Sequence, residues 1–259
     1  DDETSRGLGD VYKRQGLRPL LGVSTWCWRE NDTMIDVIGT DAGAPASLPE
    51  ALQALVRQAD LIAAPQRMQP ALQQWLGGHY STRCINSDDP ISLCKRLTDL
   101  HSNQRGVVLA SGDPLWFGIG RILIERLGRE HLRFHPGPSS LQQAFARLGR
   151  PWQNAEWISL HGRDSAPLIQ KLQQRPSALA VLTDPSRGGV DDVRRILSSS
   201  GLEASYALWL FEALGHGDER VQCLSSAEPV PTDLHPLHLV VLLAEPPSAP
   251  IQDLSLIHI

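Results

Sequence analysis

The amino-acid sequence lacks the features of membrane-spanning and nucleic-acid-binding proteins. Its best apolar run, residues 237–244, is far shorter than the roughly 18 residues that a transmembrane helix needs. Its formal net charge of −5 provides no overall positive field for a polyanion. We therefore expect neither a membrane-spanning segment nor a nucleic-acid partner.

Cysteine is scarce and shows no pairing pattern. The four cysteines, Cys27, Cys84, Cys94 and Cys223, lie far apart and form no CxxC pair. Such usage is typical of reduced thiols in an intracellular protein, whereas metal sites and disulfide frameworks need closer spacing. We expect a cytoplasmic protein without a metal site.

Several familiar catalytic signatures are also missing. The chain contains no GxxxxGK[ST] phosphate loop, no HExxH zinc motif and no GxSxG nucleophile elbow. Its Gly118-Ile119-Gly120 stretch is a weak glycine signal, because the third glycine and the acidic partner of a dinucleotide fingerprint are absent. None of these reaction classes is supported by the sequence.

What is present is the composition of an ordinary globular protein. The chain has 259 residues, of which 41% are hydrophobic and 20% charged, enough for one large domain or two medium ones. Residues 1–33 and 246–259 share no pattern with the rest, while Met34 directly precedes an apolar run. We expect residues 1–33 to be an extraneous or disordered extension and 246–259 to be a tail, with a genuine N-terminal extension as the alternative.

Between these ends, short apolar runs alternate with helical patterns. The predicted strands are 34–38, 61–64, 107–110, 133–134, 157–160, 179–183, 206–211 and 237–243. The predicted helices are 49–59, 70–76, 92–101, 119–127, 140–148, 167–173 and 190–198. Ser47 is expected to cap the first helix, and Ser139 or Ser140 the fifth.

This alternation predicts an α/β fold with mixed, mostly parallel sheets covered by helices. The break at Pro136-Gly137-Pro138 divides the chain into two halves. We therefore expect an N-terminal α/β domain over 34–136 and a C-terminal α/β domain over 137–245.

Four loops with unusual chemistry follow predicted strands. They read GTDAG (39–43), SGDP (111–114), PGPSS (136–140) and LHGR (160–163). Glycine allows a backbone to approach a ligand closely, and ligands of open α/β sheets bind at the carboxyl ends of strands. Each loop alone reads as an ordinary turn or cap, but together they predict one site in a cleft between two lobes.

The set of motifs resembles the tetrapyrrole methylase family over about residues 34–245. The similarity is carried by SGDPLWFGIGR (111–121), PGPSSLQQAFARLGRPW (136–152), SLHGR (159–163) and VLTDP (181–185), with support from LFEALG (210–215), DER (218–220) and HPLHLVVL (235–242). The resemblance implies two α/β domains with an interdomain cleft, S-adenosylmethionine as the methyl donor, and a homodimer. Within the family it is strongest to the unit that methylates C5 of a precorrin in cobalamin biosynthesis.

Residue roles follow from the matched motifs. The resemblance implies cofactor binding by Ser111, Gly112, Asp113, Trp116, Ser139, Ser140, His161 and Leu214. It implies that Gly39 and Ala42, in the first loop, border the tetrapyrrole and the methyl donor.

Other roles come from the chemistry of the reaction. The tetrapyrrole substrate that the resemblance implies carries many carboxylates, so arginines beside the loops are candidates to hold it: Arg163, and also Arg67, Arg121 and Arg187. The catalytic base is unknown, with His161 and Asp113 as weak candidates. Trp116 and Phe117 could stack on a flat ring.

The sequence also departs from the family pattern. GTDAG lacks the second glycine of the usual first loop, and nothing after Leu243 matches a unit that methylates C15 with decarboxylation. Two alternatives stay open: methylation at another position or of another substrate, and a catalytically silent tetrapyrrole-binding protein. C15 methylation would require a separate subunit, unless the sequence is truncated. Whether the substrate ring contains cobalt is also open.

Overall fold

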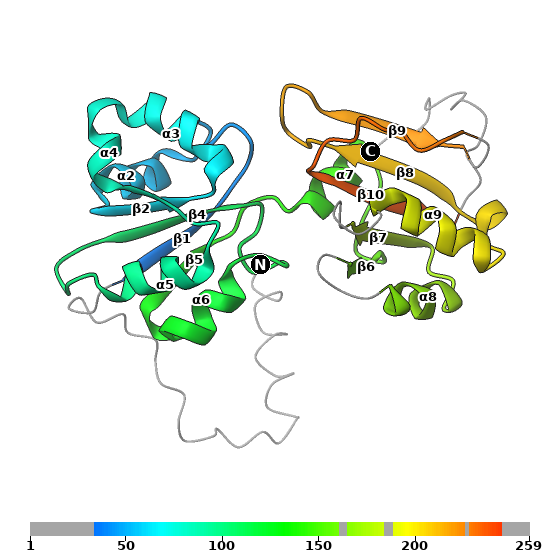
Figure 1. The fold of residues 1–259 in the computed structure, drawn as a ribbon, viewed down its shortest axis with the longest axis horizontal. Helices are drawn as coiled ribbons and strands as arrows, with labels where there is room; N and C mark the ends of the chain where they lie inside the picture. Colours follow the sequence, from blue (N-terminus) through cyan, green and yellow to red (C-terminus); the bar gives the residue numbers. More distant parts are fainter. Residues whose placement is uncertain (1–33, 161–164, 184–188, 226–227, 245–259) are drawn as a thin grey trace, which may run out of the picture. The chain divides into compact units, whose positions relative to one another are not determined.

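The computed structural model describes residues 34–160, 165–183, 189–225 and 228–244. These residues form two five-stranded sheets with helices packed on their faces (Figure 1). The predicted extension 1–33 and tail 246–259 lie outside the described residues, as do His161, Arg163 and Arg187. Within the described ranges no helix is long and apolar enough to cross a bilayer.

The first sheet is entirely parallel. Its strands are β1 (Ile35–Thr40), β2 (Leu61–Ala64), β3 (Cys84–Asn86), β4 (Gly106–Ser111) and β5 (Leu132–His135), in the order β3-β2-β4-β1-β5. Thr40 pairs with Ser111, so the carboxyl ends of β1 and β4 are level and their loops leave the sheet side by side. Asp36 on β1 also accepts two hydrogen bonds from Arg133 on β5, at 2.6 and 2.9 Å.

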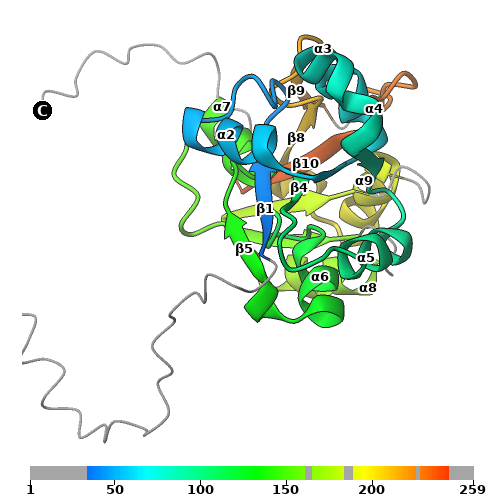
Figure 2. The same ribbon diagram turned by 90° about the vertical axis from the view of Figure 1, so that its left-hand side faces the viewer.

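Helices cover both faces of this sheet, as Figures 1 and 2 show. The helices are α2 (Glu50–Gln58), α3 (Gln69–Leu76), α4 (Tyr80–Arg83), α5 (Pro90–Thr98) and α6 (Gly120–Leu127). Val56 of α2 and Leu72 of α3 pack with Ile38, while Leu93 of α5 packs with Val37 on the opposite face. Because neighbouring β1 residues face different helix layers, the whole strand is buried, and it is apolar apart from Asp36 and the terminal Thr40.

The second sheet is mostly antiparallel. Its strands are β6 (Glu156–Ser159), β7 (Ala178–Leu182), β8 (Ala207–Glu212), β9 (Arg220–Leu224) and β10 (His238–Leu243), in the order β6-β7-β10-β8-β9. Only β6 and β7 pair in parallel. Helix α7 (Ser140–Arg147) packs on one face, and α8 (Ala166–Gln173) and α9 (Gly189–Ser199) pack on the other.

The α/β fold class predicted from the alternation is confirmed, and parallel pairings predominate over the two sheets together. The unequal distribution was not anticipated, because antiparallel β9 follows β8 after a short turn instead of a helix. Short β3 and α4 were also missed.

Of the predicted helix caps, one is confirmed and one is wrong. Ser139 caps α7 in a capping box with Gln142, as expected. Ser47 does not cap α2: the N-cap of that helix is Pro49, and the Ser47 hydroxyl donates to Asp41 instead.

Three backbone segments meet at the carboxyl end of β1. A Cβ atom placed on Gly39 would lie 2.3 Å from the nitrogen of Gly137 and 2.5 Å from the oxygen of Gly112. A Cβ placed on Gly137 would lie 2.5 Å from the carbonyl carbon of Gly39. Only glycine fits at Gly39 and Gly137, because the neighbouring atoms belong to backbone and cannot rotate away.

We expect Gly39→Ala to lower the free energy of unfolding by about 1–3 kcal/mol, the usual cost of overpacking. Urea denaturation measures the change. Gly78→Ala is the matched control, because a Cβ there meets nothing within 4 Å. Equal destabilisation in both variants would show that the backbone contact at Gly39 is not responsible.

Candidate active site

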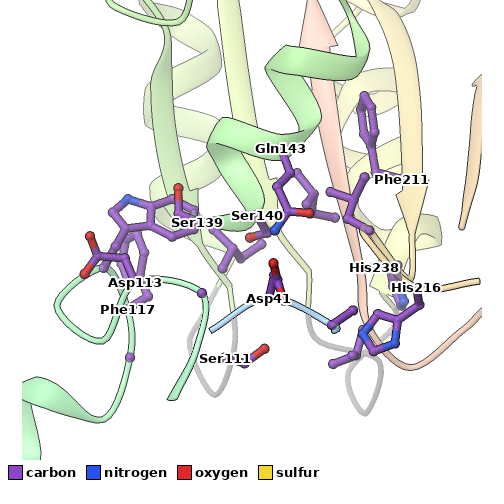
Figure 3. Close-up of a pocket in the computed structure, with 18 of the residues that line it drawn as sticks. Asp41, Ser111, Asp113, Phe117, Ser139, Ser140, Gln143, Phe211, His216 and His238 are labelled. Atoms are coloured by element: carbon purple, nitrogen blue, oxygen red, sulfur yellow. The ribbon is translucent and has the colours of Figure 1, made fainter. Parts of the chain in front are cut away.

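A cavity of about 380 Å³ lies at the loops that follow β1 and β4 and at the N-terminus of α7 (Figure 3). Strand ends of the second sheet, including Ser159, Leu182 and Leu239, complete its lining. Its volume falls within the ~300–1,000 Å³ typical of small-molecule sites.

The loops after β1 and β4 are joined to each other. The Thr40 hydroxyl donates to the carbonyl of Ala110 at 2.9 Å, and the Gly112 N–H donates to the carbonyl of Thr40 at 2.8 Å. Gly112 has a φ of +69°, a conformation that favours glycine. These contacts fix the pocket wall through backbone atoms.

The SGDP loop turns tightly before α6. The Asp113 carboxylate accepts from the N–H of Leu115 at 2.8 Å, and the Asp113 carbonyl accepts from the N–H of Trp116 at 3.2 Å. Phe117 has a φ of +52° and is 46% exposed on the pocket lining. Its ring packs edge-on against that of Trp116, with the centroids 5.1 Å apart. The loop therefore holds an exposed aromatic ring at the pocket in an unfavourable backbone conformation.

Ser139 and Ser140 place the N-terminus of α7 at the pocket. The Ser139 hydroxyl accepts from the N–H of Gln142 at 3.2 Å, and the Gln142 side chain accepts from the N–H of Ser139 at 2.8 Å. Ser140 follows this cap on the lining. The first N–H groups of a helix attract a carboxylate or another anion.

An ion pair connects α7 to the loop that carries Leu214 and His216. Arg147 donates to both Glu219 oxygens at 2.5 and 3.0 Å, and the second oxygen also accepts from the N–H of Gly215 at 2.6 Å. The hydrogen bonds from Arg147 hold the pKa of Glu219 below its ordinary value, and partial burial opposes them. The same bonds raise the pKa of Arg147.

A second network supports the segment before β10. Glu212 is fully buried and accepts from Arg220 and from the N–H of His235, each at 2.8 Å. The His235 carbonyl accepts from Nδ1 of His238 at 2.7 Å, and a carbonyl oxygen can only accept, so Nδ1 carries a hydrogen. Buried Glu212 thus positions the segment that leads to the pocket.

The charged lining is acidic. Among the described residues, the lining contains the carboxylates Asp41 and Asp113 and no lysine or arginine. Within the same residues no cluster of three or more histidine, cysteine, aspartate or glutamate side chains could hold a metal ion. The lining also includes the histidines His216 and His238. The two carboxylates of the pocket suit a cationic ligand.

The structure brings most of the predicted site residues together. The following line the one pocket: Ala42, Ser111, Gly112, Asp113, Trp116, Ser139, Ser140 and Leu214. Gly39 lies behind the lining, against Gly112 and Gly137. His161 and Arg163 fall outside the described residues. Their functional roles stay predictions.

Two of the arginines considered do not line this pocket. Arg67 lies in the 3₁₀ turn Gln66–Met68, and Arg121 pairs with Glu125 at 2.8 Å on the exposed face of α6. Sequence reasoning missed Asp41, Gln143, His216 and His238 on the lining. Asp41 lies inside the recognised GTDAG loop and His216 two positions after Leu214, so following each loop residue by residue would have found them.

Comparison with known proteins defines the class of this α/β protein. The family model of tetrapyrrole (corrin/porphyrin) methylases matches residues 34–228. The chain belongs to this family.

Two relatives by sequence act on precorrins, according to their names. The precorrin-6Y C(5,15)-methyltransferase [decarboxylating] of Sinorhizobium sp. is 37% identical over 137 residues, which are 52% of this chain and 32% of that protein. The chain thus matches about a third of that relative's length. The cobalt-precorrin-7 C(5)-methyltransferase of Salmonella typhimurium is 30% identical over 192 residues, 74% of this chain and 90% of the relative.

Solved structures share the fold. A precorrin-6Y methylase from Archaeoglobus fulgidus matches with a TM-score of 0.61 at 19% identity, over 83% of this chain and 99% of that one. A uroporphyrin-III C-methyltransferase from Thermus thermophilus, in complex with S-adenosylhomocysteine, matches with a TM-score of 0.58 at 18% identity, over 81% and 91% of the two chains.

We expect Glu219→Gln to reduce the acid sensitivity of the fold. Because the folded-state pKa of Glu219 is lowered, its stabilisation is present above the unfolded pKa of about 4.3 and is lost as the pH falls through the folded value. Urea denaturation between pH 7 and pH 3 should show a smaller loss of stability in the variant than in the wild type. Glu125→Gln, which removes an exposed helix pair, is the control and should keep the wild-type profile. Identical profiles in wild type and Glu219→Gln would contradict the role of this ion pair.

Proposed function

We propose that this protein transfers the methyl group of S-adenosylmethionine to C5 of a precorrin, as precorrin-6Y or cobalt-precorrin-7, in cobalamin biosynthesis. The observation that carries the proposal is the single pocket lined by seven residues with implied cofactor roles: Ser111, Gly112, Asp113, Trp116, Ser139, Ser140 and Leu214. The names of the Sinorhizobium and Salmonella relatives support the substrate class and the ring position.

The residues present fit the methyl donor. S-adenosylmethionine has a sulfonium and an ammonium cation, one carboxylate and an apolar-faced adenine. The acidic lining suits the cations, the N-terminus of α7 suits the carboxylate, and Leu182, Phe211 and Leu214 provide apolar wall. When bound, the donor supplies an electrophilic methyl group on a positively charged sulfur.

The protein's own contribution to this reaction is alignment. The hydrogen bonds between Thr40, Ala110 and Gly112 give the pocket a wall of fixed shape. Rigid walls can hold two reactants at the near-attack separation of about 3–3.5 Å. The apolar side chains on the lining exclude water from that point. Because the ring carbon itself is electron-rich, no covalent enzyme intermediate is needed.

A proton leaves the ring after methylation and needs an acceptor. Asp113, on the lining, keeps one oxygen bonded to Leu115 while the carboxylate remains on the pocket wall. We retain Asp113 and His161 as candidates for this base.

We further infer that the halves 34–136 and 137–245 are separate α/β domains with a cleft between them. Each half has its own sheet and its own apolar clusters, which supports this division. The substrate would then be bordered by Gly39 and Ala42 and held by Arg163.

We also infer a homodimer in the cytoplasm. Exposed apolar side chains, such as Trp152, Trp157 and Ile169, support an interface between copies. The free thiols of Cys84, Cys94 and Cys223 support a reducing compartment.

Turnover with methyl-labelled S-adenosylmethionine tests the reaction. We expect label to enter precorrin-6Y or cobalt-precorrin-7, with one methyl group added at C5 as located by NMR. Transfer to a different carbon would support the second candidate, methylation at another ring position. Cofactor binding without transfer to any tetrapyrrole would instead identify a silent binding protein and refute the proposal.

The exposed ring of Phe117 provides a test of substrate contact. We expect Phe117→Ala to raise KM for the tetrapyrrole about two- to tenfold, which corresponds to the usual free energy of an aromatic contact. The affinity for S-adenosylhomocysteine should not change. Leu115→Ala is the matched control, because Leu115 is 56% exposed on the same loop but does not line the pocket. An equal effect of both variants on KM, or on the oligomeric state, would indicate a role outside the pocket.

A further inference from the structure

Asp41 places a carboxylate near the middle of the pocket. It directly follows β1, whose last residue is Thr40, and its side chain is half-buried. Figure 3 shows the Asp41 carboxylate between Ser111 and Ser140, whereas Asp113 lies at the edge of the view. No role follows for Asp41 from the motifs that identify the family, since the first loop is where this chain departs from them.

Local hydrogen bonds fix this carboxylate and leave half of it available. Its Oδ1 accepts from the N–H of Gly43 at 2.9 Å and from the hydroxyl of Ser47. Its Oδ2 has no hydrogen-bond partner in the part of the chain that the structure describes. The carboxylate is therefore oriented by its own loop rather than by a ligand.

The surroundings do not neutralise its charge. The described lining offers no lysine or arginine, and the other carboxylate there, Asp113, adds to the negative potential. A negative charge in a partly enclosed, low-dielectric space attracts a cation more strongly than it would in water.

We propose that Asp41 makes the pocket prefer the methyl donor, whose sulfur is positively charged, to the product, whose sulfur is neutral. This inference rests on the proposed function. A sulfonium has no N–H or O–H to donate, so a protein recognises it by charge. Methyl transfer leaves the C–S electron pair on sulfur, so the sulfur of S-adenosylhomocysteine is a neutral thioether, while its ammonium and carboxylate groups are the same as in the donor. The carboxylate of Asp41 thus attracts S-adenosylmethionine and gives no such attraction to the product, which limits product inhibition.

This role differs from that of a catalytic base. Attraction to the sulfonium stabilises the bound reactant and fades as the charge leaves sulfur, so it contributes to affinity and not to kcat. A base acts in the proton transfer itself, and its loss typically lowers the rate by about 10²–10⁴-fold.

Calorimetry with Asp41→Asn tests the proposal, using S-adenosylmethionine and S-adenosylhomocysteine as paired ligands. We expect the variant to bind S-adenosylmethionine about tenfold more weakly and S-adenosylhomocysteine less than twofold more weakly, the first change being that of one partly screened charge pair. Ser47→Ala is the matched control: it removes a hydrogen bond to Oδ1 but keeps the charge, and it should preserve the wild-type ratio of affinities. Thermal unfolding monitored by circular dichroism checks that both variants fold.

Other results would overturn the inference. If Asp41→Asn lost the same affinity for both ligands, Asp41 would contact a group that the two ligands share. If neither affinity changed, Asp41 would have no role in binding the cofactor. If Ser47→Ala also lost the wild-type ratio of the affinities for S-adenosylmethionine and S-adenosylhomocysteine, the shape of the loop and not the charge of Asp41 would be the cause. A hundredfold fall in kcat of Asp41→Asn at saturating donor would identify a base instead. If the wild type bound neither ligand, the proposed function would fall together with this inference, whereas the other outcomes leave the function standing.

Discussion

The close approach of three backbone segments at Gly39, Gly112 and Gly137 is the constraint on which the pocket depends. A single added carbon at Gly39 would lie 2.3 Å from the nearest backbone atom. Because these segments carry the ends of β1 and β4 and the start of α7, their contact sets the distances between the first-loop carboxylate, the SGDP turn and the Ser139 cap. The pocket wall is consequently a property of main-chain geometry more than of side-chain packing.

Two glutamates in residues 137–245 support this pocket wall. Glu219 joins Arg147 of α7 to the N–H of Gly215, and buried Glu212 joins Arg220 to the N–H of His235. Each carboxylate accepts hydrogen bonds from both an arginine side chain and a backbone N–H group. Such charge-assisted bonds are stronger than neutral ones, and they fix loops that have little apolar contact of their own. The loops that border the small-molecule site are thus tied to α7 and to β8 by charged hydrogen bonds.

The elements that could be predicted from the sequence are those with a strong periodic signal. Apolar strands such as β1 and β4, and amphipathic helices such as α2 and α9, were predicted to within a few residues. Short β3 spans only three residues, of which Cys84 and Ile85 are apolar, so its pairing with β2 depends on tertiary contact that no local pattern reports. The antiparallel β9 was missed because its five residues, Arg220–Leu224, mix charged, polar and apolar types and contain no continuous apolar run.

The candidate site shows a similar division. Glycine and serine motifs identified the loops, since their chemistry is local. Asp41 lies within the first loop that the motifs identified, although its position between Ser111 and Ser140 depends on the fold. His238, at the start of β10, reaches the same lining from a segment far away in sequence and could not be inferred from spacing alone.

The central position of β1 has a consequence for biosynthesis. β1 pairs with β4 and β5, and Asp36 on β1 meets Arg133 on β5 at a separation of 97 residues. At a ribosomal rate of about 5–20 residues per second, β1 waits on the order of 5–20 s after its synthesis before β5 exists to cover its second edge. During that time an apolar strand with unpaired backbone groups is a target for chaperones and for aggregation. Cellular yield of this protein should therefore respond to the speed of translation between these two strands.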